Sequence, residues 1–246
     1  MNIQGKKILI TGANGGIGSA LIKALLARQA GKIYAAARDP KSLRESFAAE
    51  ADRVFPVQLD ITDSASIEQL ARDCGDVDIL INNAGINRGQ WFTATAGLDA
   101  ARNEMEVNYF GTLGMCRAFA PLFVARKAGM IVNVCSIIGM VNMPANGTYC
   151  ASKAAVHSLT QGLRGEMAPH GVKVLGVYPG PVETRMTEGL EMPKTSPDAV
   201  AKAIVDGMAE AKPTITPDPM SSQLYGFLLK DYESAEKEIG AVLPRA

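Results

Sequence analysis

Tyr149 and Lys153 are the residues of this chain whose types and spacing could do chemistry together. If their segment is helical, side chains four residues apart lie on one face, so the Lys153 ammonium can act on the Tyr149 phenol. A free Tyr has a pKa near ~10, and a proton donor works best when its pKa lies near the operating pH. A neighbouring cation favours phenolate, so the pair predicts a phenol with a lowered pKa. The alternative is an ordinary exposed helix pair, and the spacing by itself leaves both open.

Ser136 and a glycine-rich turn give this pair a context. Ser136 lies thirteen residues before Tyr149. The turn from Thr11 to Gly18 reads Thr-Gly-Ala-Asn-Gly-Gly-Ile-Gly and directly follows an apolar run. Glycines there let the backbone approach a pyrophosphate, and the N-terminus of a following helix favours negative charge. A purely structural turn is the alternative, but the position after a first strand favours a nucleotide site.

Short apolar runs alternate with amphipathic segments, and this alternation predicts how these residues are positioned. Strands are predicted at Lys7–Thr11, Lys32–Ala37, Val54–Leu59, Val77–Asn82, Met130–Cys135 and Val172–Tyr178. Helices are predicted near 17–29, 41–50, 64–73, 100–126, 148–168 and 197–210. Such alternation is typical of right-handed βαβ crossovers that cover both faces of a parallel sheet. We therefore expect an α/β protein with a doubly wound parallel sheet, a Rossmann fold in three α/β/α layers.

Composition bounds the domain count and the class of partner. The 246 residues with 47% hydrophobic content suit a single domain over 1–246, in which the Pro-, Glu-, Thr- and Met-rich segment 181–196 is predicted to be a mobile loop. Equal numbers of acidic and basic residues, 25 each, argue against a nucleic-acid partner. No apolar run approaches the roughly 20 residues that cross a bilayer, and the N-terminus leads directly into a strand. We expect a cytoplasmic protein without a membrane partner.

The cysteines and histidines receive structural interpretations. There is no CxxC spacing among the four cysteines, Cys74, Cys116, Cys135 and Cys150. We therefore expect buried free thiols, and we expect neither a metal site nor a disulfide framework. Cys150 adjoins Tyr149, but inert packing is favoured over reactivity. His157 lies four residues past Lys153, where we favour a structural role because the Tyr149 pair already supplies the proton chemistry, and His170 is expected at the surface.

Four motifs in the right order resemble the single-domain short-chain dehydrogenases/reductases, from about residue 6 to residue 186. The stretch from Thr11 to Gly18 is similar to the family's TGxxxGxG turn, and Asn82-Asn83-Ala84-Gly85 is similar to its NNAG motif. This chain also has residues similar to the family's catalytic tetrad, namely Asn108, Ser136, Tyr149 and Lys153. The fourth motif, Pro179-Gly180 followed by Thr184, resembles the family's stretch that closes on the nicotinamide carboxamide.

The resemblance implies hydride transfer between nicotinamide C4 and a carbonyl carbon. Ser136 would hydrogen-bond the substrate carbonyl oxygen, and Tyr149 would give or take its proton. Lys153 would hold the nicotinamide ribose hydroxyls while its charge lowers the Tyr149 pKa. Asn108 would orient a water that relays protons to Lys153. The alternative for Asn108 is a helix-interior Asn that satisfies a backbone group.

Cofactor choice depends on the end of the second strand. Ala37 stands where NAD-type members of the family carry an acid, and Arg38 follows directly, so NADP(H) is favoured over NAD. Two features argue against NADP(H). Asp39 would repel a 2′-phosphate, and the glycine-rich turn has Asn14 and Gly15 where many NADP-preferring relatives add a basic residue.

Asp60 is expected at the adenine edge with Ile61 flanking the ring. The alternative for Asp60 is a helix N-cap, although Asp63 fills that position better. The residues predicted to bind the cofactor are Gly12, Asn14, Gly15, Gly16, Ile17, Gly18, Arg38, Asp60, Ile61, Asn83, Ala84, Gly85, Tyr149, Lys153, Pro179, Gly180, Val182 and Thr184.

The substrate pocket is expected between the loops near Gln90–Phe92, Ile137–Met143 and 181–192. Met at such positions is often core filler, and Trp91 suits a subunit contact equally well. An apolar, adaptable pocket indicates a ketone or secondary alcohol with a hydrophobic body. The residues predicted to contact substrate are Ser136, Ile138, Met140, Met143, Tyr149 and Met186.

The predicted function is an NADP-dependent short-chain alcohol dehydrogenase or carbonyl reductase. One alternative is a non-catalytic NADP(H)-sensing regulator, against which the intact tetrad argues; another is an NAD-dependent hydroxysteroid or 3-oxoacyl type dehydrogenase. The family also implies a homodimer or homotetramer, with the helices near 100–126 and 148–168 as the contact. The segment from Thr214 to Met220, followed by a helix, departs from the Gly-Gly-rich ending of many relatives, which argues against a role in fatty-acid synthesis.

Overall fold

A seven-stranded parallel sheet forms the centre of the computed structural model, which describes residues 2–244. The strand order is β3-β2-β1-β4-β5-β6-β7. Along β1, Ile8 and Ile10 enter the core on one face of the sheet and Leu9 enters the core on the other. Because successive side chains of a strand point to opposite faces, a sheet this apolar must be covered on both. The strands are β1 Lys7–Thr11, β2 Lys32–Ala37, β3 Val54–Gln58, β4 Ile79–Asn82, β5 Gly129–Val134, β6 Val172–Val177 and β7 Thr214–Ile215.

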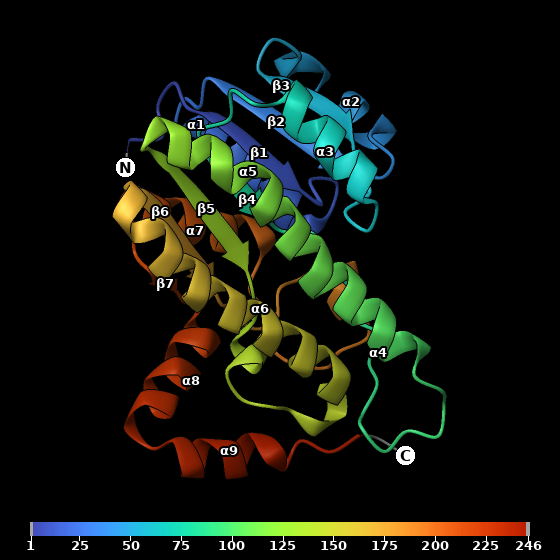
Figure 1. Cartoon of the computed structure of the whole chain (residues 1–246). Coiled ribbons are helices and arrows are strands. Elements are labelled where there is room, and N and C mark those ends of the chain that lie inside the picture. The colour runs from blue at the N-terminus through green and yellow to red at the C-terminus, as the bar shows by residue number, and fades with distance from the viewer. Residues whose placement is uncertain (1, 245–246) are drawn as a thin grey trace.

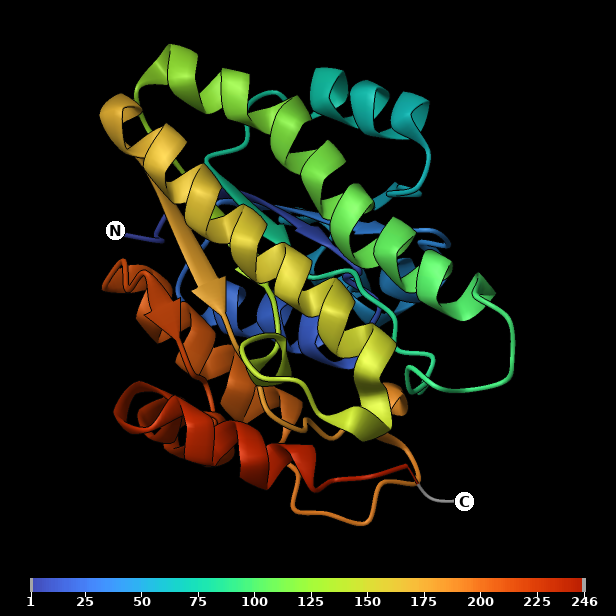
Figure 2. The same ribbon diagram turned by 60° about the horizontal axis from the view of Figure 1, so that its bottom comes forward.

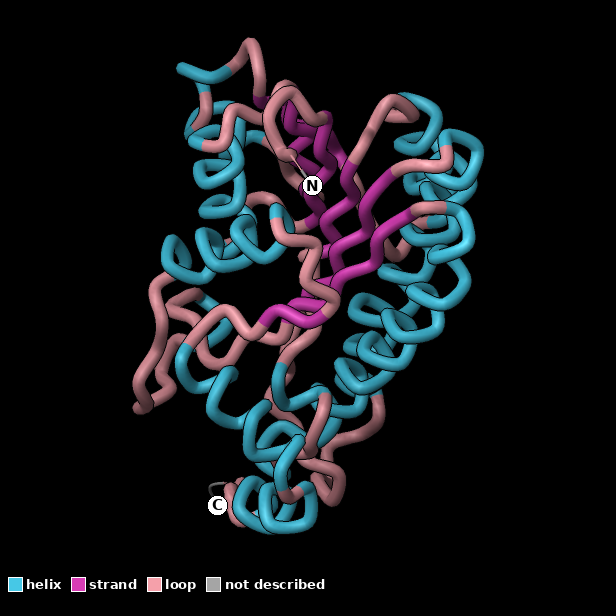
Figure 3. The backbone as a smooth tube through the Cα atoms, turned by 90° about the vertical axis from the view of Figure 1, so that its left-hand side faces the viewer, coloured by secondary structure: helices cyan, strands magenta, loops and turns pink. Residues whose placement is uncertain are grey.

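Helices cover both faces of this sheet, as Figures 1 and 3 show. One face carries α1 (Gly16–Ala27), α2 (Lys41–Ser46) and α7 (Pro197–Ala209). The other carries α3 (Ser64–Asp73), α5 (Thr112–Arg126) and α6 (Gly147–Met167). The helix α4 (Asp99–Glu104) extends the line of α5 beyond the sheet in Figure 1. This three-layer Rossmann-type architecture confirms the predicted fold class.

The predicted helix over 100–126 is wrong as a single α-helix. A π-helical segment, Met105–Gly111, separates α4 from α5. The six predicted strands agree with β1 to β6 to within two residues at each end, whereas β7 was not predicted. With two residues, β7 is too short to show the alternation by which strands are recognised.

The C-terminal region forms two helices, α8 (Pro219–Lys230) and α9 (Tyr232–Gly240), where the sequence predicted one. Asp231 separates them, because its backbone is not helical (φ −155°, ψ 87°) and its side chain accepts a hydrogen bond from the Ser234 amide at the start of α9. Figure 2 brings these helices, coloured dark orange to red, forward at the bottom of the view. Leu228 of α8 and Ala235 of α9 pack into one apolar cluster with the chain that follows β5.

The segment 181–196 is tied together at its base. Val182 and Thr195 form a parallel bridge, in which the Thr195 amide donates to the Pro181 carbonyl (3.0 Å) and the Glu183 amide donates to the Thr195 carbonyl (2.9 Å). Its predicted mobility stays a prediction. Across residues 2–244, no helix is both long and apolar enough to cross a membrane, and no three His, Cys, Asp or Glu side chains form a group that could hold a metal ion.

Candidate active site

The glycine-rich turn after β1 and the Asn-Asn-Ala-Gly stretch after β4 meet at the carboxyl edge of the sheet. The Thr11 hydroxyl accepts hydrogen bonds from the amides of Asn83 and Ala84, both at 3.0 Å. The Asn83 side chain in turn donates to the carbonyls of Thr11 (3.0 Å) and Gly12 (3.1 Å). The strands β1 and β4 are neighbours at the point where the strand order reverses. In open α/β sheets, ligands bind in the crevice at this switch point.

The glycine-rich turn after β1 forms an open cradle, which side chains in place of its glycines would fill. Gly12 has φ +63°, which favours glycine, and a Cβ on Gly18 would overlap the Gly12 carbonyl oxygen. A Cβ on Gly16 would lie 2.5 Å from Cγ2 of Thr184, so the 181–196 segment borders the cradle. The helix α1 begins at Gly16 without a side-chain cap, which leaves its first amides for a ligand. These residues fit the pyrophosphate of a dinucleotide.

Arg38 lies exposed just beyond β2, and within the described residues no hydrogen bond or salt bridge holds its guanidinium. Its charge reaches Asp60: two hydrogen bonds from Thr62 lower the pKa of the Asp60 carboxyl most, and Arg38 lowers it further. Asp39 turns toward the Lys41 amide, from which it accepts a hydrogen bond at 3.0 Å.

Asp60 is not a helix cap. Its carboxylate accepts from the amide (2.9 Å) and hydroxyl (2.7 Å) of Thr62, whereas Asp63 caps α3 by accepting from the Ala65 amide at 3.0 Å, as predicted. Ile61 is buried, and a Cβ on Gly111 would lie 2.8 Å from its side chain. Adenine contacts for Asp60 and Ile61 stay predictions.

Ser136, Tyr149 and Lys153 gather at the same edge of the sheet. Ser136 follows β5, and its hydroxyl donates to the Pro179 carbonyl at 3.4 Å. Tyr149 and Lys153 lie one turn apart on α6, with the ammonium 5.8 Å from the centre of the phenol ring. Both are buried, at 8% and 4% exposure. The Lys153 ammonium donates to the carbonyl of Val134 at 2.9 Å. The pair is therefore not an exposed helix pair.

Asn108 lies within the π-helical segment and is fully buried. Its side chain accepts from the Ile86 amide (2.8 Å) and donates to the Ile86 carbonyl (2.9 Å) and the Ser152 hydroxyl (2.8 Å). It therefore satisfies a backbone group, as the alternative interpretation expects, and also joins the loop after β4 to α6. A Cβ on Gly85 would lie 3.1 Å from the Asn108 oxygen and 3.2 Å from the Lys153 nitrogen, so glycine leaves room for both. The water-relay role of Asn108 stays a prediction.

The predicted lowering of the Tyr149 pKa is wrong for the free protein. Burial raises the pKa of the phenol, and contact with the Ser136 hydroxyl opposes that rise. Burial also lowers the pKa of Lys153 to about 8. The physical reason is that both groups leave water, and desolvation favours the neutral form of each.

Glu104 is a buried residue of the site that the sequence did not reveal. One oxygen of its fully buried carboxylate accepts from the Arg88 amide at 2.6 Å. The other has no hydrogen-bond partner in the part of the chain that the structure describes. Its charge contributes to the raised pKa of Tyr149. Its spacing of four from Asn108 was the available signal, but a charged residue in a helix is usually exposed.

The four residues predicted to contact substrate besides Ser136 and Tyr149 divide into two groups. Ile138 and Met140 pack against the apolar cluster that joins α8 and α9 to the chain after β5, which supports core filling. Met143 is half-buried, and Met186 is 46% exposed on the 181–196 segment. Their contact with substrate stays a prediction.

The loop with Gln90–Phe92 reaches the start of α6, just before Tyr149. The amide of Thr148 donates to the Gln90 carbonyl at 3.2 Å, and a Cβ on Gly147 would lie 3.0 Å from the Phe92 ring. This loop therefore borders the tetrad.

Histidines and cysteines take the structural positions that were expected. A hydrogen bond of 2.8 Å joins Nδ1 of His157 to the Tyr178 hydroxyl, and His170 is exposed. The four cysteines of the described residues are free and buried. Burial raises the pKa of the Cys150 thiol, which makes it a poorer nucleophile.

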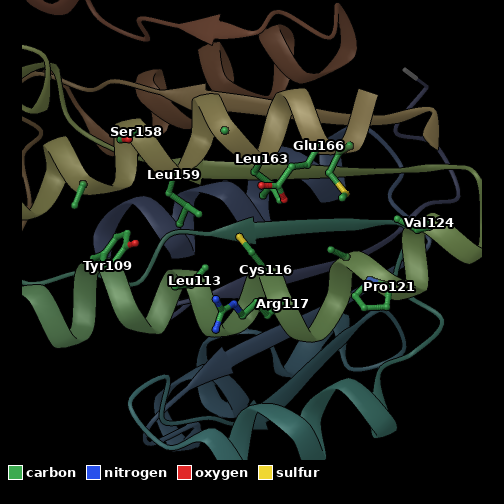
Figure 4. A pocket seen from close by; sticks show the side chains of 14 residues that line it. Tyr109, Leu113, Cys116, Arg117, Pro121, Val124, Ser158, Leu159, Leu163 and Glu166 are labelled. Carbon is green, nitrogen blue, oxygen red and sulfur yellow. The ribbon is translucent and has the colours of Figure 1, made fainter. Parts of the chain in front are cut away.

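A groove of about 780 Å³ runs between α5 and α6, away from the tetrad (Figure 4). Leu113 and Arg117 of α5 line one side, and Leu159, Leu163 and Glu166 of α6 line the other. Neither charged group forms a salt bridge among the described residues.

Comparison with known proteins agrees with this geometry. The short chain dehydrogenase family matches residues 6–194. An NADP-dependent 3-hydroxy acid dehydrogenase of Schizosaccharomyces pombe is 34% identical over 75% of this chain and 74% of its own. A short chain dehydrogenase of Burkholderia cenocepacia in complex with NADP superposes with a TM-score of 0.90 and 37% identity, covering 97% of this chain and 99% of that one. A Burkholderia phymatum short chain dehydrogenase/reductase in complex with NAD gives 0.85 and 25%, covering 95% and 96%. The chain belongs to the short-chain dehydrogenase/reductase family of oxidoreductases.

Proposed function

We propose that this chain transfers hydride between NADP(H) and a ketone or secondary alcohol of apolar character, with Tyr149 as general acid and base. The observation that carries the proposal is the buried group of Ser136, Tyr149 and Lys153 beside the glycine cradle. A phenol, a hydroxyl and an ammonium at one strand edge suit proton transfer to a carbonyl oxygen.

The cofactor supplies or accepts the hydride when it is bound. Ser136 donates a hydrogen bond to the substrate carbonyl oxygen, and Tyr149 delivers the proton to that oxygen in reduction. Tyr149 is protonated at neutral pH, as any phenol with an ordinary or raised pKa is, and this is the form that reduction needs. Lys153, with a pKa of about 8, is mostly cationic at pH 7 and holds the ribose hydroxyls. Asn108 keeps α6 aligned with the loop after β4.

Arg38 supports the choice of NADP(H). Its guanidinium has no hydrogen bond or salt bridge within residues 2–244, and Asp39 is held by the Lys41 amide. A free guanidinium beyond β2 suits a 2′-phosphate. We expect Arg38→Ala to raise KM for NADPH at least about tenfold while KM for NADH changes little. Equal effects on both cofactors would contradict this preference.

The substrate proposal has two supports. Exposed apolar side chains of the loop after β4 and of the 181–196 segment, including Phe92, Met186 and Leu190, lie on segments that border the cradle and the tetrad. The Schizosaccharomyces pombe relative acts, by its name, on 3-hydroxy acids. We therefore include 3-hydroxy acids and β-keto esters that carry a hydrophobic group among the candidate substrates.

An activity screen tests the proposal directly. NADPH and NADH consumption is followed with aromatic, aliphatic, steroid and β-keto ester ketones, and NADP⁺ reduction with 3-hydroxy acids. Turnover that disappears in Tyr149→Phe while NADPH still binds supports the enzyme. Tight NADPH binding without turnover across the whole panel would favour a cofactor-sensing regulator instead.

We also propose that the groove between α5 and α6 is where two copies associate. In a two-fold arrangement, Arg117 of one copy would face Glu166 of the other, across the apolar floor formed by Leu159 and Leu163. Leu159→Arg should turn a dimer or tetramer into a smaller species in light scattering coupled to size-exclusion chromatography. Leu229→Arg is the matched control, because Leu229 is 71% exposed on α8. An unchanged mass in Leu159→Arg would refute this contact.

A further inference from the structure

The Pro179–Gly180 turn is held from two sides. On one side, the Pro179 carbonyl accepts from the Ser136 hydroxyl (3.4 Å) and from the Ile137 amide (3.1 Å). On the other, the Gly180 amide donates to Oδ2 of Asp218 at 2.8 Å. A single peptide unit therefore joins the segment that carries the catalytic serine to the C-terminal region.

Asp218 is an unusual helix cap, because it is 5% exposed and uses both carboxylate oxygens. Oδ1 accepts from the Ser221 amide (2.8 Å), and Oδ2 accepts from the Ser221 hydroxyl (2.8 Å) as well as from Gly180. Three donors satisfy a carboxylate that burial would otherwise penalise heavily. One bond would be enough to begin α8, as Asp231 shows at the exposed start of α9. The bond to Gly180 therefore adds something beyond capping.

Backbone pairing fixes where Asp218 stands. The Tyr178 amide donates to the Ile215 carbonyl at 2.8 Å, so β7 runs beside the end of β6 and brings Asp218 against the turn. A Cβ on Gly180 would lie 2.8 Å from Oδ1 of Asp218, which leaves no space between the two. The contact is thus built from the strand pairing, the cap and a glycine.

We propose that Asp218 is a positioning residue that clamps the Pro179–Gly180 turn and thereby sets the approach of the nicotinamide to Ser136 and the substrate. The clamp ties the cofactor side of the site to α8, whose Leu228 packs with the chain that follows β5. Its effect on the nicotinamide rests on the proposed function, whereas the clamp itself is a property of the free protein.

Hydrogen exchange of the free protein tests the clamp without cofactor or substrate. In Asp218→Ala the Gly180 amide loses its acceptor, and its exchange should accelerate at least about tenfold more than that of the β1 amides. Asp231→Ala is the matched control, because it removes an equivalent cap bond far from the turn. In Asp218→Asn one carboxylate oxygen becomes an NH2 group, so the side chain can accept from the Ser221 amide or from the Gly180 amide but not from both. Gly180 exchange should therefore accelerate in this variant too, by no more than in Asp218→Ala, and Asp218→Asn serves as the test if Asp218→Ala does not fold.

NADPH binding and isotope effects test the consequence. We expect Asp218→Ala to weaken NADPH binding, measured by cofactor fluorescence, about tenfold, and to raise the deuterium isotope effect on reduction as hydride transfer becomes slower. Asp231→Ala should leave both unchanged although it lowers thermal stability. Equal losses in the two variants, or Gly180 exchange that is unchanged in Asp218→Ala, would overturn the proposal. A wild-type chain that binds neither NADPH nor NADH would overturn the proposed function and the positioning role, and the exchange result would still decide whether the clamp exists.

Discussion

Replacing Lys153 with methionine should stabilise the free protein at neutral pH, although it removes a member of the tetrad. Methionine is also unbranched, is one heavy atom shorter than lysine, and carries no charge to desolvate. Lys153 is buried at 4% exposure, and burial lowers its pKa from 10.5 to about 8. This difference means that burying the Lys153 amine lowers the free energy of unfolding by about 3 kcal/mol at pH 7.

The pH dependence gives this prediction its sign. Between about pH 8 and 10.5 the unfolded chain keeps the Lys153 proton while the folded protein releases it. The unfolded state binds more protons there, so wild-type stability rises with pH through this window, and the full cost applies below it. At pH 10 less than about 1 kcal/mol of the cost remains.

A lost hydrogen bond opposes the gain. The Val134 carbonyl accepts from the Lys153 ammonium at 2.9 Å and has no donor in the variant, which costs about 1–2 kcal/mol. We therefore expect Lys153→Met to be about 1–2 kcal/mol more stable than wild type at pH 7 and about 1 kcal/mol less stable at pH 10.

Urea unfolding followed by circular dichroism at pH 7 and pH 10 measures both differences. Lys23→Met on the exposed side of α1 is the control, and its difference from wild type should be small and independent of pH. The reasoning is refuted if Lys153→Met is less stable than wild type by the same amount at both pH values.

Three further predictions concern the cradle and the buried polar groups. Gly18→Ala should cost about 2 kcal/mol or more in urea unfolding and abolish NADPH binding, because its Cβ would overlap a backbone oxygen of the turn. Glu104→Gln keeps one acceptor and removes a charge that raises the Tyr149 pKa, so the pH profile of alcohol oxidation should move to lower pH without loss of stability; a move to higher pH would contradict it. Thr160→Val should cost about 1–3 kcal/mol in urea unfolding, because the buried Asn133 amide that donates to Thr160 at 2.9 Å loses its acceptor; a stability equal to wild type would contradict it.

The sheet could be predicted because its strands are covered on both faces and read as apolar runs. Ile79 to Ile81 illustrate this, since each is fully buried whichever face it points to. The strand β7 could not be predicted, because its two residues are defined by pairing with β6 and carry no pattern of their own. The break at Asp231 was missed for a related reason: a single capping bond ends one helix and begins another.

The positions of the tetrad followed from its motifs, whereas its electrostatics did not. Spacing predicts that Lys153 and Tyr149 share a helix face, which the structure confirms. Spacing does not reveal that the ammonium binds the Val134 carbonyl or how deeply both groups are buried. Glu104 and Asp218 were missed because an acidic residue signals a solvated surface until its donors are known.

The π-helical segment Met105–Gly111 has a consequence for how this chain can vary. A π turn accommodates an additional residue within a helix, and each residue of an α-helix turns the side chains by about 100°. Glu104 faces the loop after β4, and Leu113 faces the groove. The rotation about the helix axis from one side chain to the other therefore includes the turn that the extra residue adds. A related chain one residue shorter here would be a continuous α-helix and could keep one of these two faces in phase, but not both.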